Sequence, residues 1–184
     1  MTLIIKIFCK ITQSIRYFVY KLKFHDQLII EKSSVIPKTT IFRINGNGRI
    51  TIGKNVELRE GCILNVSNGG LIKINDNVFI NDYSTLNARE RVVIDEGVQI
   101  GQGVKIYDHD HDYDKEDFKY FFKISPVFIG KNTWIGSNVI LLRGSNIGKR
   151  CIIGANTVIK GNVSDHTLIY ENRVQKVQRL ETRK

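Results

Sequence analysis

The sequence predicts an all-β chain wound as a parallel β-helix, a triangular prism of about six coils. Large apolar residues recur at every sixth position, and the residue two before each of them is mostly small or β-branched. The insertions that interrupt this period follow every third repeat. A period of six matches neither an α-helix nor an amphipathic strand, whose periods are 3.6 and 2. It matches a short strand and a turn, repeated three times in each coil.

Residues 1–24 predict a separate amphipathic helix, because apolar residues occur there at helical spacing. This segment carries five Lys or Arg residues and no acidic residue. Such a helix could lie on an anionic membrane surface, or it could cap the prism and cover its unpaired strand edges. Charges interrupt the apolar run, so we expect no membrane span. No small-residue cleavage site follows an unbroken apolar core, so we expect no cleaved signal peptide either. The apolar positions are Ile4, Ile7, Phe8, Ile11, Ile15, Phe18, Val19 and Leu22.

Residues 25–170 form the predicted prism. Stacked coils lie about 4.8 Å apart, as neighbouring strands do, so the sixth-position residues should form columns inside it. Insertions rich in Asn and Gly mark corners between triplets of repeats. The predicted inward residues are Ile30, Ile36, Phe42, Ile52, Leu58, Leu64, Ile74, Ile80, Leu86, Ile94, Ile100, Ile106, Ile129, Ile135, Leu141, Ile147, Ile153 and Ile159.

The three cysteines are few, odd in number and far apart in the sequence. They do not form a disulfide framework, and a reducing, intracellular setting fits them best. Cys62 and Cys151 each stand two residues before an inward position. We therefore expect them to pack as small hydrophobic side chains rather than to carry an acyl group.

A protruding loop is predicted at residues 107–126, because 22 residues rather than five separate Ile106 from Ile129. Loops of this length in a compact domain are usually functional or disordered. The loop begins with DHDHDYD, in which His109 and His111 would share one face of an extended strand and could ligate zinc. A calcium loop is excluded, because Tyr113 and Lys119 stand where it needs glycine and glutamate.

The other two histidines lie outside the central coils. His166, in the segment SDHT, fits a turn, and His25 follows the predicted helix. Only two histidines therefore remain for the loop, and we expect a catalytic base there rather than a metal site.

The stretch PVFIGKNTWIGSNVILLRGSNIGKRCIIGANTVIKG combines a Pro-Val start with N-x-W-I-G and I-I-G-A. With the hexads, it resembles the hexapeptide-repeat acyltransferases, most of all the galactoside, maltose and surface-polysaccharide O-acetyltransferases. The resemblance covers roughly residues 30–175. It implies a left-handed β-helix, acetyl-CoA as co-substrate, and a homotrimer with active sites between neighbouring prisms. The hand comes from the resemblance and not from the periodicity.

The resemblance also implies a histidine base five residues past the last inward residue before the loop. That position is His111, and His111-Asp112-Tyr113-Asp114 matches the family pattern except that Asp112 replaces a proline. His109 lies only three residues past Ile106 and is the alternative base. An imidazole suits the removal of a hydroxyl proton near neutral pH, and a nearby aspartate could fix its tautomer. Asp108, Asp110, Asp112 and Asp114 are the candidates.

Further site residues follow from the same resemblance. Asn81, in N-V-F-I-N, is implied as an acceptor contact, and Ser137 and Ala155 as CoA contacts. Trp134 and Lys160 are weaker candidates for the cofactor site. The backbone N–H groups of Gly136 and Ser137 could stabilise a tetrahedral oxyanion.

The net charge of +10 is concentrated at the two ends of the chain. Residues 1–24 contribute +5 and the C-terminal tail, residues 171–184, contributes +3. The body carries no basic, aromatic-bearing stripe of the kind that binds nucleic acid. Cations near the last coil could bind the phosphates of CoA. Alternatively, the basic C-terminal residues could form a solvated tail. These cations are Lys149, Arg150, Lys160, Arg173 and Lys176.

The function that the sequence favours is acetyl-CoA-dependent O-acetylation of a sugar or a surface-polysaccharide precursor through a ternary complex. N-acetylation of a nucleotide-linked amino sugar is the alternative reaction, and a non-catalytic β-helix scaffold is the alternative class. We expect a cytoplasmic protein, with peripheral contact at the inner membrane face as one role for residues 1–24.

Overall fold

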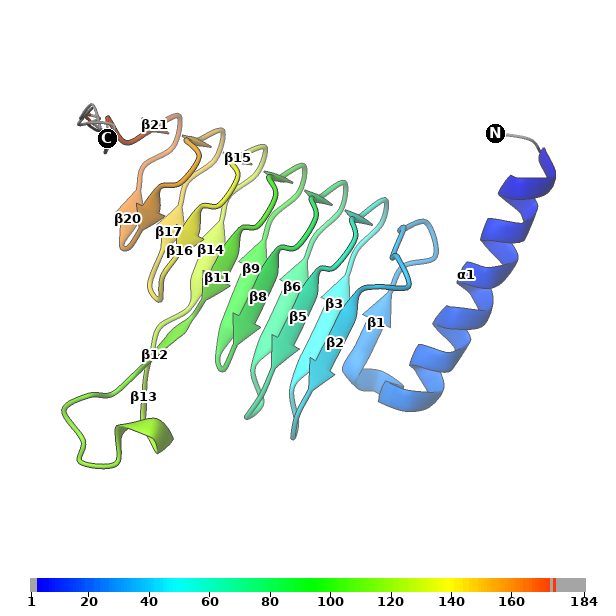
Figure 1. Cartoon of the computed structure of the whole chain (residues 1–184), viewed down its shortest axis with the longest axis horizontal. Coiled ribbons are helices and arrows are strands. Elements are labelled where there is room, and N and C mark those ends of the chain that lie inside the picture. The colour runs from blue at the N-terminus through cyan, green and yellow to red at the C-terminus, as the bar shows by residue number, and fades with distance from the viewer. Residues whose placement is uncertain (1–2, 173, 175–184) are drawn as a thin grey trace, which may run out of the picture.

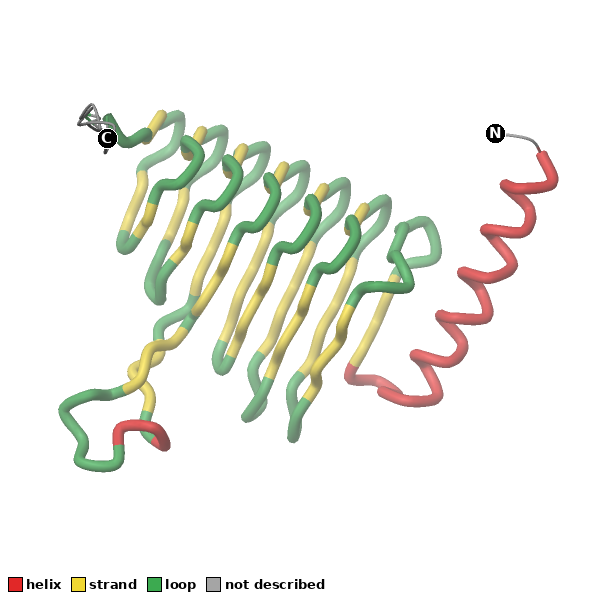
Figure 2. The backbone as a smooth tube through the Cα atoms, in the orientation of Figure 1, coloured by secondary structure: helices red, strands yellow, loops and turns green. Residues whose placement is uncertain are grey.

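The computed structural model describes residues 3–172 and 174, with side chains described from residue 12 onward. Three parallel sheets wind around one axis, with a helix at the N-terminal end and a hairpin that projects from the side (Figures 1 and 2). Successive strands enter the first, second and third sheet in turn, so neighbours within a sheet lie one coil apart in the sequence. This is the predicted prism, and its architecture is consistent with a left-handed β-helix.

The described strands fill about six coils and begin a further one. The first sheet contains β1 (Leu28–Ile30), β3 (Arg49–Ile52), β6 (Leu71–Ile74), β9 (Arg91–Ile94), β14 (Val127–Ile129), β17 (Asn146–Ile147) and β20 (Asn162–Val163). The second contains β4 (Glu57–Leu58), β7 (Phe79–Ile80), β10 (Gln99–Ile100), β15 (Trp134–Ile135), β18 (Ile152–Ile153) and β21 (Leu168–Ile169). The third contains β2 (Ile41–Ile44), β5 (Ile63–Val66), β8 (Thr85–Ala88), β11 (Lys105–Tyr107), β16 (Ile140–Leu141) and β19 (Val158–Ile159).

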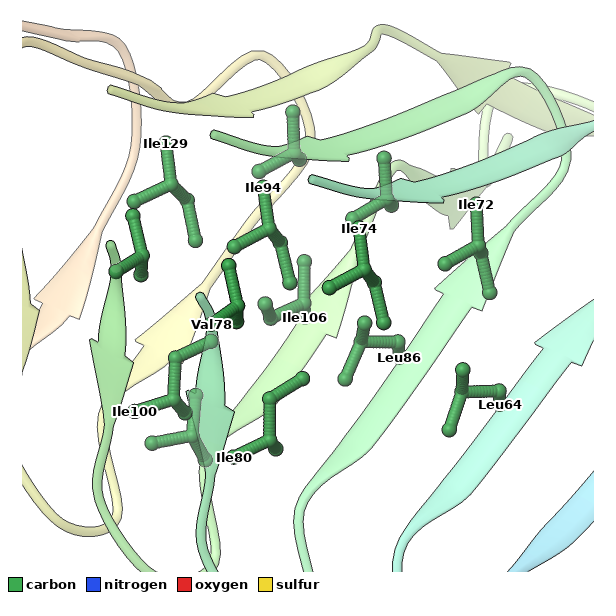
Figure 3. Packing of buried hydrophobic residues seen from close by; sticks show 14 of the residues in the cluster. Leu64, Ile72, Ile74, Val78, Ile80, Leu86, Ile94, Ile100, Ile106 and Ile129 are labelled. Carbon is green, nitrogen blue, oxygen red and sulfur yellow. The ribbon is translucent and has the colours of Figure 1, made fainter. Parts of the chain in front are cut away.

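The predicted columns are confirmed. In the first sheet Ile52 pairs with Ile74, Ile74 with Ile94, and Ile94 with Ile129. Figure 3 shows Ile74, Ile94 and Ile129 of this column side by side inside the prism. All the predicted inward residues are buried except Ile30, which is half-buried in the first coil. Cys62 and Cys151 are buried as well, and burial raises the pKa of the Cys62 thiol.

The corners of the prism are built by residues with a left-handed backbone. Along the edge between the first and second sheets, Asn55, Asn77 and Asn132 have φ between 54° and 58°. Asparagine tolerates this region better than most residues do. His166 lies on the same edge with φ 59°, which confirms the prediction that it is a turn residue. Repeated corner residues thus explain how one short sequence unit can be stacked many times.

Helix α1 (Leu3–Phe24) lies at the N-terminal end of the prism and is followed by a short 3₁₀ turn, η1 (His25–Gln27) (Figure 1). The Tyr17 hydroxyl donates to the carbonyl of Ser34 at 2.7 Å, and Arg16 donates to the carbonyl of Ile36 at 2.6 Å. Tyr20 packs edge-on against Phe42, with ring centroids 5.2 Å apart. These contacts hold the helix against the first coil, as a cap would be held.

Two groups of residues from the sequence predictions lie outside the described side chains. The apolar helix positions Ile4, Ile7, Phe8 and Ile11 are among them, and so are the tail cations Arg173 and Lys176. The described part of the chain has no helix that is both long and apolar enough to cross a membrane.

The predicted loop at residues 107–126 contains ordered elements. Strands β12 (His109–His111) and β13 (Phe122–Ile124) pair antiparallel, and the 3₁₀ turn η2 (Phe118–Tyr120) lies between them. The hairpin leaves the edge between the third and first sheets, where β11 ends and β14 begins (Figure 1). The middle of the stretch DHDHDYD, from His109 to His111, is therefore held on a strand, and its last three residues lie in the turn that follows.

Replacing one stacked core residue tests whether the aliphatic columns stabilise the fold. Ile100→Ala should lower the free energy of unfolding by about 2–5 kcal/mol, because it opens a cavity between two stacked neighbours. Gln99→Ala is the matched control, since Gln99 precedes Ile100 on β10 and is exposed. Urea unfolding at one protein concentration measures both. Equal effects of the two changes would contradict the assignment of Ile100 to the core.

Candidate active site

Two imidazoles and one aromatic ring share a face of the hairpin. His111 stands directly opposite Phe122 across the strands, and His109 lies two residues before His111 on the same side. The Phe122 ring centroid is 4.7 Å from that of His111 and 5.5 Å from that of His109. His111 is exposed and His109 is half-buried. The expected pairing of the two histidines on one face is therefore present in the fold.

Asp108 anchors both His109 and the base of the hairpin. Its carboxylate is fully buried and lies 2.8 Å from His109 Nδ1. It also accepts backbone N–H groups of Arg89, Glu90 and Arg91 at 2.7–3.0 Å. Burial alone would raise the pKa of Asp108, but the hydrogen bonds from His109 and these N–H groups outweigh it and hold the pKa below its ordinary value. Asp108 is therefore a carboxylate throughout the neutral range.

His111 has a different support. Its Nδ1 lies 3.1 Å from the carbonyl oxygen of Phe118 in η2. A carbonyl can only accept, so this contact requires the proton on Nδ1 and leaves Nε2 as an acceptor. The contact between His109 and the Asp108 carboxylate selects the same tautomer. Both rings can thus present an unprotonated Nε2 to a hydroxyl group.

The remaining carboxylates of the stretch are paired with cations. Asp110 accepts from Arg143 Nε at 2.6 Å, and Arg143 follows β16, one coil further along the prism. Lys123 lies 3.2 Å from Asp112 and also contacts Asp114. Of the four candidate aspartates, Asp108 is the one with a histidine contact among the described residues.

The described residues contain no group of three His, Cys, Asp or Glu side chains placed to hold a metal ion. A hollow of about 1030 Å³ lies between α1 and the first coil, and its lining includes no residue of the hairpin. The two histidines therefore lie away from this hollow.

The residues implied for acceptor and cofactor lie on two different edges. Asn81, Ser137 and Ala155 follow β7, β15 and β18, at the edge between the second and third sheets. Trp134 is 55% exposed on the outer face of the second sheet. Lys160 follows β19 at the edge between the third and first sheets, which is the edge of the hairpin. One chain alone does not bring Asn81, Ser137 and Ala155 to its own histidines.

Gly136 cannot supply the oxyanion contact that the sequence suggested for it. Its N–H donates to the carbonyl of Ile153 at 2.7 Å, as part of the ladder that joins successive coils. A Cβ atom at Gly136 would lie 2.6 Å from the backbone nitrogen of Ala155. The glycine therefore allows the close approach of two coils, and its N–H is already used.

Sequence reasoning missed Arg89 and Arg143. Arg89 lies 19 residues before Asp108, and its guanidinium carbon is 3.4 Å from the Phe122 ring centroid. The pairing of Leu86 with Ile106 places Arg89 one coil before the base of the hairpin. Aligning the sequence coil by coil would have placed Arg89 next to the base of the hairpin.

Comparisons with known proteins identify the family of this chain. Residues 126–161 match the family model described as bacterial transferase hexapeptide (six repeats). WbbJ of Escherichia coli K12, named as an O-acetyl transferase of lipopolysaccharide biosynthesis, is 33% identical over 137 residues. That alignment covers 68% of this chain and 69% of WbbJ. The chain belongs to the hexapeptide-repeat acyltransferases.

Solved structures of acyltransferases share its fold. A Vibrio cholerae acetyltransferase crystallised with acetyl-CoA aligns with a TM-score of 0.54 and 23% identity, covering 85% of this chain and 71% of that one. AntD, an N-acyltransferase of Bacillus cereus crystallised with dTDP and 3-hydroxybutyryl-CoA, aligns with a TM-score of 0.66 and 21% identity. The coverage is 83% of this chain and 81% of AntD. At these identities the likeness shows a shared fold and no more.

Asp108→Asn should destabilise this acyltransferase by about 1–3 kcal/mol at neutral pH, because a buried amide cannot satisfy three N–H donors as a carboxylate does. The lowered pKa means that the stabilisation is complete above the ordinary aspartate value of 3.8 and is lost as pH falls through the folded-state pKa. The difference between wild type and variant should therefore shrink in acid. Urea unfolding at several pH values measures it.

Glu116→Gln is the control for this experiment, because Glu116 is exposed in the same hairpin. It should leave stability unchanged at every pH. A stability of Asp108→Asn equal to that of wild type at neutral pH would show that the carboxylate does not hold the hairpin.

Proposed function

We propose that this protein is an acetyl-CoA-dependent O-acetyltransferase that acts on a hydroxyl group of a sugar or a surface-polysaccharide precursor. The observation that carries the proposal is the pair of hairpin imidazoles, each with Nδ1 held by an acceptor. The name of WbbJ supports a hydroxyl acceptor. The acetyl-CoA bound to the Vibrio cholerae acetyltransferase supports the donor.

His111 is the proposed general base. As the acceptor oxygen attacks the thioester carbonyl, its proton passes to Nε2 of the imidazole and the new C–O bond forms. The tetrahedral intermediate then collapses, the C–S bond breaks, and the proton returns to the thiolate of CoA. His109, held by Asp108, is the second imidazole beside it. Positioned proton transfer of this kind contributes about 10² to 10⁴ in rate.

The proposed acetyl-CoA site uses residues of the neighbouring edge. Ser137 and Ala155 would contact the pantetheine arm, and the Ser137 N–H replaces Gly136 as the proposed donor to the oxyanion. Trp134 offers an exposed flat surface. Cations for the phosphates would come from the other two edges, because Lys149 and Arg150 lie between the first and second sheets and Lys160 lies on the edge of the hairpin. Asn81 is the proposed acceptor contact.

A homotrimer with active sites between the prisms would unite the two edges. The hairpin of one chain would face the edge of its neighbour that carries Asn81, Ser137 and Ala155. The exposed aromatic residues of the hairpin support such a contact. Single exposed apolar side chains are common on free surfaces, whereas several close together usually mark a surface that binds a partner. They are Tyr113, Phe118, Tyr120 and Phe121.

Loss of the base should slow transfer strongly without disturbing the fold. His111→Ala should lower kcat/KM about 10² to 10⁴-fold and keep the oligomeric state of wild type. His109→Ala should cost less, because His109 acts beside the base. Release of CoA from acetyl-CoA, followed with a thiol reagent and a panel of oligosaccharides and nucleotide sugars, measures the rates.

His166→Asn is the matched control, since His166 occupies a left-handed turn that asparagine tolerates. Wild-type activity in His111→Ala, with a larger loss in His109→Ala, would move the base to His109. Pairs of acceptors that differ only by hydroxyl or amine separate O-acetylation from N-acetylation, the reaction class that AntD's name describes.

We also propose that α1 docks on the anionic surface of the inner membrane, on the cytoplasmic side. Its inner face contacts the first coil, while four apolar residues at helical spacing on the opposite face are 50–62% exposed. They are Ile15, Phe18, Val19 and Leu22. Lys21 and Lys23 are exposed beside them, and the helix contains no acidic residue. An anionic bilayer complements this charge, whereas a second copy of the helix would repel it.

Vesicle sedimentation tests the docking surface. Phe18→Ser with Leu22→Ser should reduce binding to vesicles of phosphatidylcholine and phosphatidylglycerol several-fold, because it removes the inserted apolar side chains. Val158→Ser is the control, since Val158 is an exposed apolar residue of the prism. No binding by wild type, together with a changed oligomeric state in the double variant, would instead assign this face to contact between copies.

A further inference from the structure

The guanidinium of Arg89 differs from two neighbouring cations that are already paired with carboxylates of the hairpin. Arg143 is paired with Asp110, and Lys123 is paired with Asp112 and Asp114. The side chain of Arg89 has no ion pair or hydrogen bond in the part of the chain that the structure describes. Its backbone N–H binds Asp108, so the residue is fixed at the base of the hairpin while its charge is unused.

Arg89 is nevertheless held in place. Its guanidinium lies over the Phe122 ring, 3.4 Å from the centroid, and the side chain is half-buried. Stacking on an aromatic face leaves the N–H groups at the rim of the guanidinium plane available. The result is a positioned cation with unused donors, which is the arrangement that recognises a carboxylate or a phosphate through two parallel hydrogen bonds.

The same Phe122 ring contacts both candidate bases. The His111 and His109 ring centroids lie 4.7 and 5.5 Å from it. Arg89 and the two imidazoles are therefore grouped around one aromatic ring, and an anion held by Arg89 would lie beside the same ring.

The position along the prism separates this cation from the proposed cofactor site. Arg89 follows β8, one coil before the hairpin, whereas Ser137 and Lys160 lie one and two coils after it. The same coil as Arg89 carries Asn81, the proposed acceptor contact. Arg89 thus lies on the acceptor side of the histidines.

We propose that Arg89 binds an anionic group of the acceptor, so that the substrates are sugars that carry a carboxylate or a phosphate near the acetylated hydroxyl. This inference rests on the proposed function for the identity of the acceptor. The anion subsite itself is a binding property, and it can be measured without acetyl transfer.

Nuclear magnetic resonance of labelled histidine provides the test. Glucuronate and glucose 1-phosphate should shift the His109 and His111 signals of wild type. Arg89→Gln should weaken this binding about 10- to 100-fold, the loss expected for hydrogen bonds to a charged group. Methyl glucoside, which is neutral, should affect the variant and wild type equally. The stronger of the two anions identifies the group that is bound.

Arg91→Gln is the matched control. Arg91 is exposed at the start of β9, two residues further on, and also binds Asp108 through its backbone N–H. It should behave as wild type. Binding of both anions to Arg89→Gln with wild-type affinity would overturn the proposal, and so would anions that shift neither histidine in wild type.

Two further measurements distinguish this proposal from other roles for Arg89. The affinity for acetyl-CoA should be the same in wild type and Arg89→Gln, and a parallel loss would assign Arg89 to the phosphates of CoA instead. In acetyl-transfer assays, kcat/KM should fall in the variant for acidic acceptors and stay unchanged for the methyl ester of a carboxylate acceptor, which carries no charge. Equal losses for both would show that Arg89 only supports Phe122.

Discussion

The main-chain ladder between successive coils is the constraint on which the rest of the molecule depends. Each strand donates to the carbonyl groups of a strand one circuit away, as Gly101 does to Ile135 and Gly136 to Ile153. The ladder sets the rise per coil and keeps equivalent residues in vertical register. Side chains then only decide whether a position faces the interior or the surface. Aliphatic residues at every sixth position face the interior in every coil, and they therefore fill the prism with continuous columns.

This constraint also explains what the sequence could and could not predict. The columns from Ile52 to Ile147, the burial of Cys62 and Cys151, and the turn at His166 all follow from the period, because the ladder repeats it faithfully. The period does not say which edge carries which residue until the corners are counted. For that reason Asn81 and the histidines were named together but lie on separate edges. The left-handed architecture likewise came from resemblance and not from spacing.

The six-residue period gives no information about the structure of the hairpin. Its pairing of His111 with Phe122 and its contacts to Asp108 arise from side chains that leave the ladder. The stretch DHDHDYD could be recognised as unusual, and one of its four aspartates could be expected to support a histidine. The choice of Asp108 depends on burial at the corner of a neighbouring coil, which local sequence does not reveal. Gly136 shows the reverse case, because a motif position suggested a free N–H that the ladder had already used.

The hairpin is fastened to coils on both sides of the one from which it emerges. Asp108 binds the backbone of the preceding coil at Arg89 to Arg91, and Asp110 binds Arg143 of the following coil. A duplication or deletion of a whole circuit is the change that a solenoid tolerates most easily. Such an event next to β11 would preserve every column yet detach one of these two anchors. The number of circuits flanking the hairpin is therefore tied to its orientation, and drift in overall length should be confined to the distant ends of the column.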